Sequence, residues 1–560
     1  MIALGSFDRP TALTRLADTH FDLLVVGGGI TGAGVALDAA ARGLRTALVE
    51  RDDFASGTSS KSSKLVHGGL RYLQQGEVAL VYQALHERQR LLRNAPHLVH
   101  VLPFLIPILT KDGVINRKLA RAMGWAMWMY DFTGGLRIGK LHKRLSPDEA
   151  VAYMPTLRQD HLASAYLFYD AQADDARLTL TIARTAALDH GAVVVNGAAI
   201  TRLHKDGERV SGATVEADGR SIEVEADVVV NATGVWSDEV RRLDEGAHPH
   251  SSRPAKGVHL TVPWHLVRNE IAAIVPVPGD RRSVFVVPWG DLTYVGTTDT
   301  DYDGPLEHPT CTADDVAYLL RALNGAMGSD LSPDDVVGTW AGLRPLVKDA
   351  SSSRTADLSR RHKVLTSPSG LISINGGKLT TYREMSADTV DATLHLLGDR
   401  VRGRVRRRSP TKRLRLRGAE GHAEAGQAKV TGLAEDDVEH LASRFGGEAR
   451  VLFAMIEADP TLAERIVPPL PYLAAEVVYA ARHEMSRSVD DVLSRRTRAR
   501  LLARDDSAAA ASAVAELMAG ALGWTKAEQA RQVKAYRGLV DDDREAADLP
   551  EQALELAVGS

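Results

Sequence analysis

Three glycines near the start of the chain are spaced to bind a pyrophosphate. Gly27, Gly29 and Gly32 form a G-x-G-x-x-G pattern directly after the apolar run 23–26. The first glycine permits a tight turn, the second lets the backbone approach the phosphates, and the third lets the next helix pack closely on the strand. Glu50 stands 21 residues after Gly29, where a carboxylate can accept hydrogen bonds from the hydroxyls of an unphosphorylated ribose. The spacing therefore predicts a dinucleotide site.

Flavin and nicotinamide dinucleotides share this pattern, so more distant segments must distinguish them. A second glycine turn, Asn231–Gly234, follows the apolar run 228–230, and a third, at Gly376 and Gly377, follows the run 371–374. A helix that begins after the third turn would direct its positive end at the reduced ring of a flavin. Several converging glycine turns favour FAD, and NAD stays open at this point.

The elements that must position these turns indicate a parallel α/β sheet. The runs 23–26 and 46–49 have the length and composition of buried strands, and a helix-forming stretch at 33–41 between them ends at Gly43. A strand–helix–strand unit of this kind is typical of nucleotide-binding sheets. Further strands of this type are expected at 192–196, 227–231 and 371–374.

The rest of the chain indicates two other kinds of domain. Residues 283–287 and 293–295 are β-rich runs joined by Pro-Trp-Gly-Asp, which predicts an antiparallel hairpin. Residues 400–417 contain ten Arg or Lys and no acid, and the chain beyond them has helical spacing. We therefore expect an α/β FAD-binding Rossmann-like domain, an inserted mainly antiparallel β substrate-binding domain and an all-helical C-terminal domain. The predicted bounds are 1–100, 160–240 and 350–398 for the FAD-binding domain, 101–159 and 241–349 for the substrate-binding domain, 399–418 for a basic linker and 419–560 for the helical domain.

Composition limits the class of protein. The 560 residues carry 68 basic and 72 acidic side chains, a formal charge of −4, so no field of the whole molecule attracts nucleic acid. Cys311 is the only cysteine, which excludes an internal disulfide and a cysteine-based zinc cluster and favours a reducing, cytoplasmic location. The most apolar run, 101–109, is interrupted by prolines and is far too short to span a bilayer.

One segment resembles the signature of a known enzyme family. Residues 57–73 read GTSSKSSKLVHGGLRYL, which is similar to the signature of the FAD-dependent, aerobic respiratory glycerol-3-phosphate dehydrogenases of the D-amino-acid oxidase-like superfamily. The resemblance implies FAD bound non-covalently, oxidation of sn-glycerol 3-phosphate to dihydroxyacetone phosphate, and electron transfer to a membrane quinone. Further blocks resemble the family in the family's order at 27–34, 255–259, 296–299, 342–346, 376–383 and 476–497.

The expected contacts to FAD come from several segments far apart in the sequence. Hydroxyls at 58–60 suit the pyrophosphate and the flavin edge, and His67 is expected to pack against FAD rather than to take part in the chemistry. The predicted cofactor-binding residues are Gly27, Gly29, Ile30, Thr31, Gly32, Glu50, Arg51, Thr58, Ser59, Ser60, Leu65, His67, Gly68, Gly69, Ala232, Thr233, Gly234, Gly377, Lys378, Leu379 and Thr380.

The implied reaction needs a base and fixed cations. A secondary alcohol loses its hydride to flavin N5 while a base takes the hydroxyl proton, and the substrate phosphate needs cationic partners. We expect Arg71, Arg344 and Lys378 to bind the phosphate and Tyr72 to donate its hydroxyl to the substrate. His259 is the candidate base, because the ordinary pKa of histidine suits proton removal at neutral pH. A desolvated Lys378 is the rival base, or it stabilises the alkoxide.

Electrons destined for a quinone must leave at a membrane surface. Residues 116–144 combine seven Arg or Lys with Trp and Met side chains, as interfacial helices on anionic lipid do, and a helix packed on the core is the alternative. The run 400–417 is a second candidate, or else a solvated linker. We expect a cytoplasmic protein, peripheral on the inner face of the cytoplasmic membrane, and a homodimer stays open.

Two other functions stay open. The first is an oxidase of the same family, which passes electrons to oxygen and forms hydrogen peroxide. The second is a flavin-free protein that binds nucleic acid through the basic run 400–417, although nucleic acid is not an expected partner of the preferred enzyme.

Overall fold

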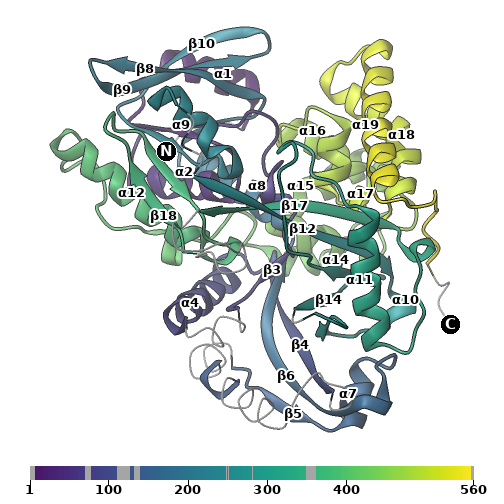
Figure 1. Cartoon of the computed structure of the whole chain (residues 1–560). Coiled ribbons are helices and arrows are strands. Elements are labelled where there is room, and N and C mark those ends of the chain that lie inside the picture. The colour runs from purple at the N-terminus through teal and green to yellow at the C-terminus, as the bar shows by residue number, and fades with distance from the viewer. Residues whose placement is uncertain are drawn as a thin grey trace.

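The described residues form two large β-sheets, a small three-stranded sheet and a group of C-terminal helices. The computed structural model describes residues 7–69, 77–109, 127–130, 139–247, 249, 251–280, 282–347 and 361–556. In Figure 1 the strands β4 and β6 extend away from the helix-covered sheet, and the last helices of the chain stand together at one side. The expected combination of an α/β part, a largely antiparallel part and a helical part is therefore confirmed.

Six described strands form the first sheet. Their order is β18-β19-β11-β1-β2-β7, with the strands from β19 to β7 mutually parallel and β18 antiparallel at the edge. Every strand predicted for this sheet is present, whereas β18 has no counterpart among the predictions. The strands are β1 (Leu23–Val26), β2 (Thr46–Val49), β7 (Val193–Val195), β11 (Val229–Asn231), β18 (Lys363–Thr366) and β19 (Ile372–Asn375).

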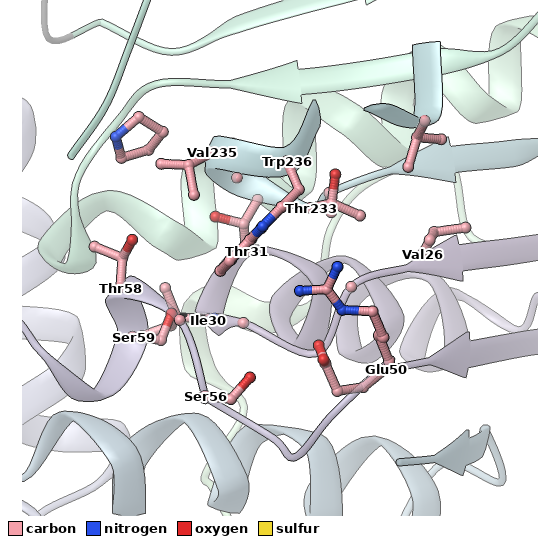
Figure 2. Close-up of a pocket in the computed structure, with 18 of the residues that line it drawn as sticks. Val26, Ile30, Thr31, Glu50, Ser56, Thr58, Ser59, Thr233, Val235 and Trp236 are labelled. Carbon is pink, nitrogen blue, oxygen red and sulfur yellow. Dashed lines mark hydrogen bonds between the residues drawn. The ribbon is translucent and has the colours of Figure 1, made fainter. Parts of the chain in front are cut away.

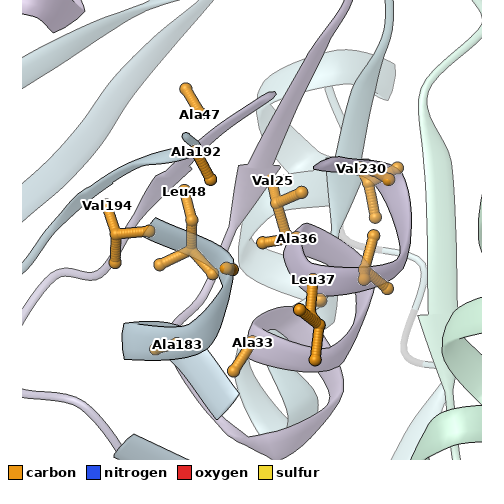
Figure 3. Packing of buried hydrophobic residues seen from close by; sticks show 14 of the residues in the cluster. Val25, Ala33, Ala36, Leu37, Ala47, Leu48, Ala183, Ala192, Val194 and Val230 are labelled. Atoms are coloured by element: carbon orange, nitrogen blue, oxygen red, sulfur yellow. The ribbon is translucent and has the colours of Figure 1, made fainter. Parts of the chain in front are cut away.

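Small side chains let helices lie close to this sheet. The helices are α2 (Ile30–Arg42), α8 (Asp175–Leu188) and α12 (Tyr382–Leu397), and α2 packs against both of the others. Figure 3 shows Val25 and Leu48 of the strands among Ala33 and Ala36 of α2 and Ala183 of α8. Because alanine adds little volume, the helices can approach the sheet and each other closely. This core holds the carboxyl ends of the strands in fixed places.

Ten described strands form the second sheet. The order is β16-β12-β15-β14-β13-β4-β6-β3, with β17 paired to β12 and β5 paired to β6. The predicted hairpin is confirmed, because β14 and β15 pair antiparallel across a turn in which Gly290 has a φ of 58°. The strands are β3 (Leu65–Val66), β4 (Val99–Leu109), β5 (Lys143–Leu145), β6 (Leu162–Ala173), β12 (Ser252–Pro263), β13 (Ala272–Pro276), β14 (Ser283–Trp289), β15 (Leu292–Gly296), β16 (Thr300–Asp301) and β17 (Gly338–Val347).

The pairing of β6 differs from the predicted domain bounds. The sequence assigns residues 160–240 to the FAD-binding domain, whereas β6 pairs with β4 along its whole length in the second sheet. The two strands share an aromatic core in which the rings of Phe104 and Phe168 lie 5.2 Å apart. The antiparallel ladder with β4 places residues 162–173 in the second sheet, and the cross-strand pair of Phe104 and Phe168 adds to it.

A further small sheet has no counterpart among the predictions. The strands β8 (Ala198–Asp206), β9 (Arg209–Ala217) and β10 (Arg220–Glu225) form an antiparallel meander. Helix α1 (Arg9–Asp18) packs on β10 and β7. The remaining helices of the first two parts are α4 (Val78–Asn94), α7 (Pro147–Tyr153), α9 (Ser237–Glu245), α10 (Trp264–Val267) and α11 (Ala313–Ala326).

The C-terminal part is helical throughout its regular elements. A π-helical turn, η12 (Asp491–Arg496), and the short α17 join α16 to α18. Its own apolar core includes Leu441, Val477 and Met518. The helices are α13 (His422–Gly426), α14 (Glu435–Phe445), α15 (Ala449–Ala458), α16 (Ala474–His483), α17 (Ala499–Leu502), α18 (Arg504–Leu522) and α19 (Lys526–Ala546).

The basic run 400–417 lies against the first sheet and its helices. Arg404 pairs with Asp22 at 2.8 Å, and Arg417 pairs with Glu448 at 2.7 Å. Several charges of this run are thus already neutralised by the protein.

Among the described helices, none combines the length and the apolar character needed to cross a bilayer.

Candidate cofactor and substrate site

A cavity of about 350 Å³ opens at the carboxyl ends of β1, β2 and β11. In open α/β sheets this edge is where ligands bind. Figure 2 shows Glu50, Ser59 and Thr233, which come from three separate segments, around the same space. The predicted cofactor-binding residues that line the cavity are Gly27, Gly29, Ile30, Thr31, Glu50, Arg51, Thr58, Ser59, Ala232, Thr233, Gly234, Gly377, Lys378 and Leu379.

The glycine turn after β1 leaves no space for larger residues. Gly27 has a φ of 106°, and a Cβ atom on it would lie 2.8 Å from the carbonyl oxygen of Ala232. A Cβ atom on Gly32 would lie 1.9 Å from the carbonyl oxygen of Gly27, so the start of α2 packs directly on the turn. The backbone N–H of Ile30 donates to Ser59 Oγ at 2.8 Å. Gly29, Ile30 and Thr31 line the cavity, so the N-terminus of α2 lies at the cavity wall, as a pyrophosphate requires.

Glu50 is a buried carboxylate on the cavity wall. Its two oxygens accept hydrogen bonds from the backbone N–H groups of Gly28 and Asp52. Burial raises the pKa of Glu50 to about 7, against the lowering effect of these two N–H donors. An adenosine ribose that donated its hydroxyl hydrogens to Glu50 would stabilise the ionised form. The glycine cradle and this acid together fit a dinucleotide.

Several predicted cofactor residues lie beside the cavity rather than on its wall. Ser60 faces the interior through its carbonyl oxygen, and Leu65 is buried in β3. The backbone N–H of His67 donates to Thr380 Oγ1 at 3.1 Å, and the N–H of Gly68 donates to Tyr130 Oη at 3.1 Å. Gly69 follows with a φ of 77°. Gly32, Ser60, Leu65, His67, Gly68, Gly69 and Thr380 thus support the segments that carry the cavity residues.

Arg71 and Tyr72 lie outside the described residues.

The candidate base His259 is on β12 and is buried. Its Nε2 shares a hydrogen bond of 2.8 Å with Ser63 Oγ, and its ring stacks on that of Trp340 at 4.7 Å. A Cβ atom on Gly296 would approach the ring to 2.2 Å, so the glycine makes room for the imidazole.

The environment of His259 keeps its ring neutral. Burial, followed by the charges of Lys64 and Arg344, holds the pKa of His259 well below its ordinary value. A neutral imidazole retains a lone pair that can take a proton. His259 does not line the cavity described above.

Arg344 and Lys378 approach the cavity from two other segments. Arg344, on β17, pairs with Asp299 at 2.8 Å and donates to Thr297 Oγ1 and the carbonyl oxygen of Thr298. The next residue, Pro345, lines the cavity. Lys378 lines it directly and stands just before η7 (Leu379–Thr381), the short turn that leads into α12. Of the predicted phosphate-binding cations, Lys378 thus lines the cavity, whereas Arg344 does not line it and is the sequence neighbour of Pro345, which does.

Among the residues of the site that were not predicted, Ser63, Trp340 and Trp236 contact predicted ones. Ser63 and Trp340 fix the ring of His259, and Trp236 lies under the guanidinium of Arg51 at 5.1 Å from the ring centroid. Ser63 is within the run 57–73, and Trp236 comes directly after the second glycine turn, so their positions in the sequence were available signals. Trp340 had none, because it meets His259 only through the pairing of β17 with β12, two strands that are far apart in the sequence.

Comparison with known proteins decides the family. Residues 22–383 match the FAD dependent oxidoreductases, and residues 409–529 match the C-terminal domain of alpha-glycerophosphate oxidase. The chain is 40% identical over 547 residues to glycerol-3-phosphate dehydrogenase 2 of Mycobacterium tuberculosis, covering 96% of this chain and 91% of that protein. The chain belongs to the FAD-dependent glycerol-3-phosphate dehydrogenase family.

More distant members agree. The mitochondrial glycerol-3-phosphate dehydrogenase of Mus musculus is 37% identical over 554 residues, covering 94% of this chain and 74% of that protein. The structure of the glycerol-3-phosphate dehydrogenase of Bacillus halodurans, solved with FAD, superposes with a TM-score of 0.77 at 31% identity, covering 97% of this chain and 99% of that one. This family member is therefore an FAD-dependent oxidoreductase, which confirms the predicted cofactor. A flavin-free protein is set aside.

Glu50 predicts that FAD binding depends on pH. Because the carboxyl group of the FAD-free protein has a pKa of about 7 and its ionised form accepts the ribose hydrogen bonds, the Kd for FAD should fall as pH rises from about 6 to about 8. By the same linkage, the raised pKa of Glu50 makes the FAD-free protein lose stability as pH rises from the ordinary carboxyl value of 4.5 to about 7. Titration of the FAD-free protein with FAD, followed by flavin fluorescence, measures the effect.

The Glu50→Gln variant should bind FAD more weakly at pH 8 and with little pH dependence. Glu239→Gln is the matched control, since Glu239 lines the same cavity but its side chain is 44% exposed. An unaltered pH dependence in Glu50→Gln would remove Glu50 from ribose binding.

Proposed function

We propose that this chain oxidises sn-glycerol 3-phosphate to dihydroxyacetone phosphate and passes the electrons to a membrane quinone. The observation that carries the proposal is the 40% identity to a named glycerol-3-phosphate dehydrogenase across nearly the whole chain. FAD, held without a covalent bond by the glycine turns, Glu50 and the hydroxyls of 58–59, supplies the hydride acceptor at N5 when it is bound. The other groups that the reaction needs come from the chain.

His259 is proposed to take the hydroxyl proton. Its hydrogen bond to Ser63 and its stacking on Trp340 fix the plane of the ring. Nδ1 is buried and makes no hydrogen bond with a described residue, so this nitrogen has capacity to bind a proton in the tautomer that carries hydrogen on Nε2. Burial beside Lys64 keeps the ring unprotonated before the reaction. Lys378 remains the rival base or the partner of the developing alkoxide.

Arg344 is proposed to bind the substrate phosphate. Asp299 and the neighbouring oxygens hold the guanidinium in one plane, so little side-chain entropy is lost when a dianion binds. Arg71 and Lys378 complete the proposed phosphate site, and Tyr72 is proposed to donate its hydroxyl to the substrate. Arg344 and Lys378 are proposed as the catalytic cations.

The dehydrogenase proposal predicts anaerobic bleaching by one substrate. Added sn-glycerol 3-phosphate should bleach the flavin absorption of the purified protein, and a soluble quinone should restore it with one quinone consumed per substrate. Residues 409–529 match a domain family that is named for an oxidase, so oxygen must also be tested as the electron acceptor. Formation of one hydrogen peroxide per substrate in air without added quinone would favour an oxidase over the proposed dehydrogenase. Absence of anaerobic bleaching would contradict both functions.

The phosphate proposal predicts a KM effect at Arg344. Loss of a charge-assisted hydrogen bond costs about 1.5–3 kcal/mol, so Arg344→Ala should raise KM for sn-glycerol 3-phosphate by about tenfold to a hundredfold with flavin content unchanged. Arg253→Ala is the control. Arg253 lies in β12, the strand that pairs with β17, and like Arg344 it forms an ion pair with an aspartate, Asp301. Steady-state kinetics with quinone measure both variants. An unchanged KM in Arg344→Ala would exclude Arg344 from phosphate binding.

Peripheral attachment to anionic lipid at the cytoplasmic face is proposed as the route to the quinone. Much of the segment 116–144 lies outside the described residues. Of the described part, Trp128 and Leu141 are exposed, at 57% and 48%, while Met127 is buried. Lys140 and Lys143 stand beside Leu141 in the sequence. Exposed apolar side chains next to cations suit the boundary between lipid headgroups and acyl chains.

This attachment predicts a loss of vesicle binding when a charge enters the apolar patch. Leu141→Asp should reduce co-sedimentation with vesicles of anionic phospholipid, because an acid at this surface opposes both burial and the negative potential. Leu365→Asp is the matched control, a leucine of 44% exposure on β18. Equal sedimentation of Leu141→Asp and the unmodified protein would contradict the placement of the patch.

A further inference from the structure

A short segment of the C-terminal domain contacts both loops that border the cofactor cavity. The segment is 495–498, at and just beyond the end of η12. The first loop is 50–56, which follows β2, and the second loop is 57–64, which leads into β3. Both loops contribute to the cavity wall, whereas residues 495–498 do not. The segment therefore acts on the cavity only through the loops.

The first loop is held at Asp53. Arg495 Nε donates to its carboxylate at 2.7 Å, and Arg496 donates through both terminal nitrogens, at 2.7 and 2.8 Å. Asn196 donates to the same carboxylate at 3.1 Å. Although burial opposes ionisation, Arg496 and Arg495 keep the pKa of Asp53 below its ordinary value. Bidentate bonding of this kind fixes orientation as well as distance.

The second loop is held at Ser60. The carbonyl oxygen of Ser60 accepts hydrogen bonds from Arg498 and from Lys64 Nζ. Both cations also bond to Asp175 Oδ1, at 3.0 and 3.1 Å. The other oxygen of Asp175 accepts from the N–H and the hydroxyl of Ser62, at 2.9 and 2.7 Å. One buried cluster thus fixes the loop at three of its residues.

This loop serves both halves of the site. On one side, Thr58 and Ser59 line the cavity, and Ser59 Oγ accepts the N–H of Ile30 at the start of α2. On the other side, Ser63 holds the ring of His259. A shift of Ser60 would therefore displace the cofactor-facing hydroxyls and the support of the proposed base together.

The backbone of Arg498 is itself strained. Its φ is 112° and its ψ is 11°, and its side chain is 1% exposed. A residue with a Cβ atom adopts such a conformation only where its surroundings over-determine it. The bonds to Ser60, to Asp175 and to the carbonyl oxygen of Ser494 supply that constraint.

We propose that Arg498 is a positioning residue for the cofactor cavity, through which the C-terminal domain fixes the loop 57–64. Arg496 acts in the same way on the loop 50–56. Retention of FAD and the setting of His259 then depend on the docking of the helical domain. The proposed effect on the cavity rests on the contacts above. Only the proposed effect on His259 rests on the proposed function.

The test compares Arg498→Met with the unmodified protein in the FAD-loaded full chain. Methionine keeps an unbranched apolar stem and removes every bond that the guanidinium makes. Amide hydrogen exchange of residues 57–66 should become faster by about tenfold or more, while exchange in α16 and α18 stays as it was. The visible circular dichroism of the bound flavin should change, FAD should dissociate faster, and kcat should fall by a larger factor than KM changes.

Arg504→Met is the matched control. Arg504 is also in the C-terminal domain and 1% exposed, but among the described residues its side chain donates only to Asp505 and to the carbonyl oxygen of Pro550. This variant should leave the exchange of 57–66 and the flavin spectrum unchanged. Equal changes in Arg504→Met and Arg498→Met would overturn the proposal, because they would show a general loss of domain stability.

Arg498→Lys keeps the test decisive if the methionine variant does not fold. A lysine restores the charge but cannot reproduce the planar fork of the guanidinium. If Arg498→Met folds, Arg498→Lys should give hydrogen exchange and flavin circular dichroism intermediate between those of the unmodified protein and Arg498→Met. If Arg498→Met does not fold, both quantities in Arg498→Lys should still differ clearly from those of the unmodified protein. Unaltered values of both in Arg498→Lys would overturn the proposal. Failure of the proposed function would appear separately, as an unmodified protein that does not oxidise sn-glycerol 3-phosphate.

Discussion

The ion pairs and hydrogen bonds of the buried Asp175 carboxylate are the interactions on which the arrangement of the α/β part, the antiparallel part and the helical part depends. It lies at the first residue of α8, where the free N–H groups and the positive end of the helix favour a negative charge, and the N–H of Ala176 donates to it at 3.0 Å. Around it stand Lys64 of the loop 57–64 and Arg498 of the C-terminal domain. Removing the carboxylate would leave Lys64 and Arg498 buried with Asp174, 3.7 Å from Arg498, as the remaining acid of the cluster, and an incompletely compensated buried charge is strongly destabilising.

The same cluster sets the electrostatics of the proposed base. Burial and the nearby charge of Arg498 lower the pKa of Lys64 to about 8, opposed by Asp175. Lys64 lies over the ring of Trp340 at 4.7 Å, and Trp340 stacks in turn on His259. A cation on one side of an indole and a neutral imidazole on the other is a stable arrangement, because protonation of His259 would add a second positive charge to a dry site. The network that docks the helical domain thereby also keeps His259 neutral, with a lone pair to offer, while its charges oppose the protonation of the ring.

Local signals were sufficient for the β1–α2–β2 unit and its glycines, because the turn, the helix and the acid all lie within one short stretch whose conformation is set by neighbouring residues. They were insufficient for β6, which pairs with β4, and for the meander β8–β10, whose residues alternate weakly between the buried and exposed faces. The site divides in the same way. The cavity residues lie in recognisable motifs, whereas the hydrogen bond between Ser63 and His259 joins residues 196 positions apart, and no spacing in the sequence encodes which serine meets which histidine.

The loop 57–64 explains why so many long-range contacts converge here. It reads GTSSKSSK and contains no apolar side chain, so it cannot hold itself in place by burying a core of its own. Its conformation must come from hydrogen bonds made by other segments, each contributing a modest net stability of about 0.5–1.5 kcal/mol unless it is charged. Asp175 supplies them from the α/β part, Arg498 from the helical part, and Tyr294 and Trp340, which donate to the carbonyl oxygens of Ser63 and Ser62, from the antiparallel sheet. Because each of the three parts contributes a contact, the loop adopts its cavity-forming conformation only when all three are correctly docked.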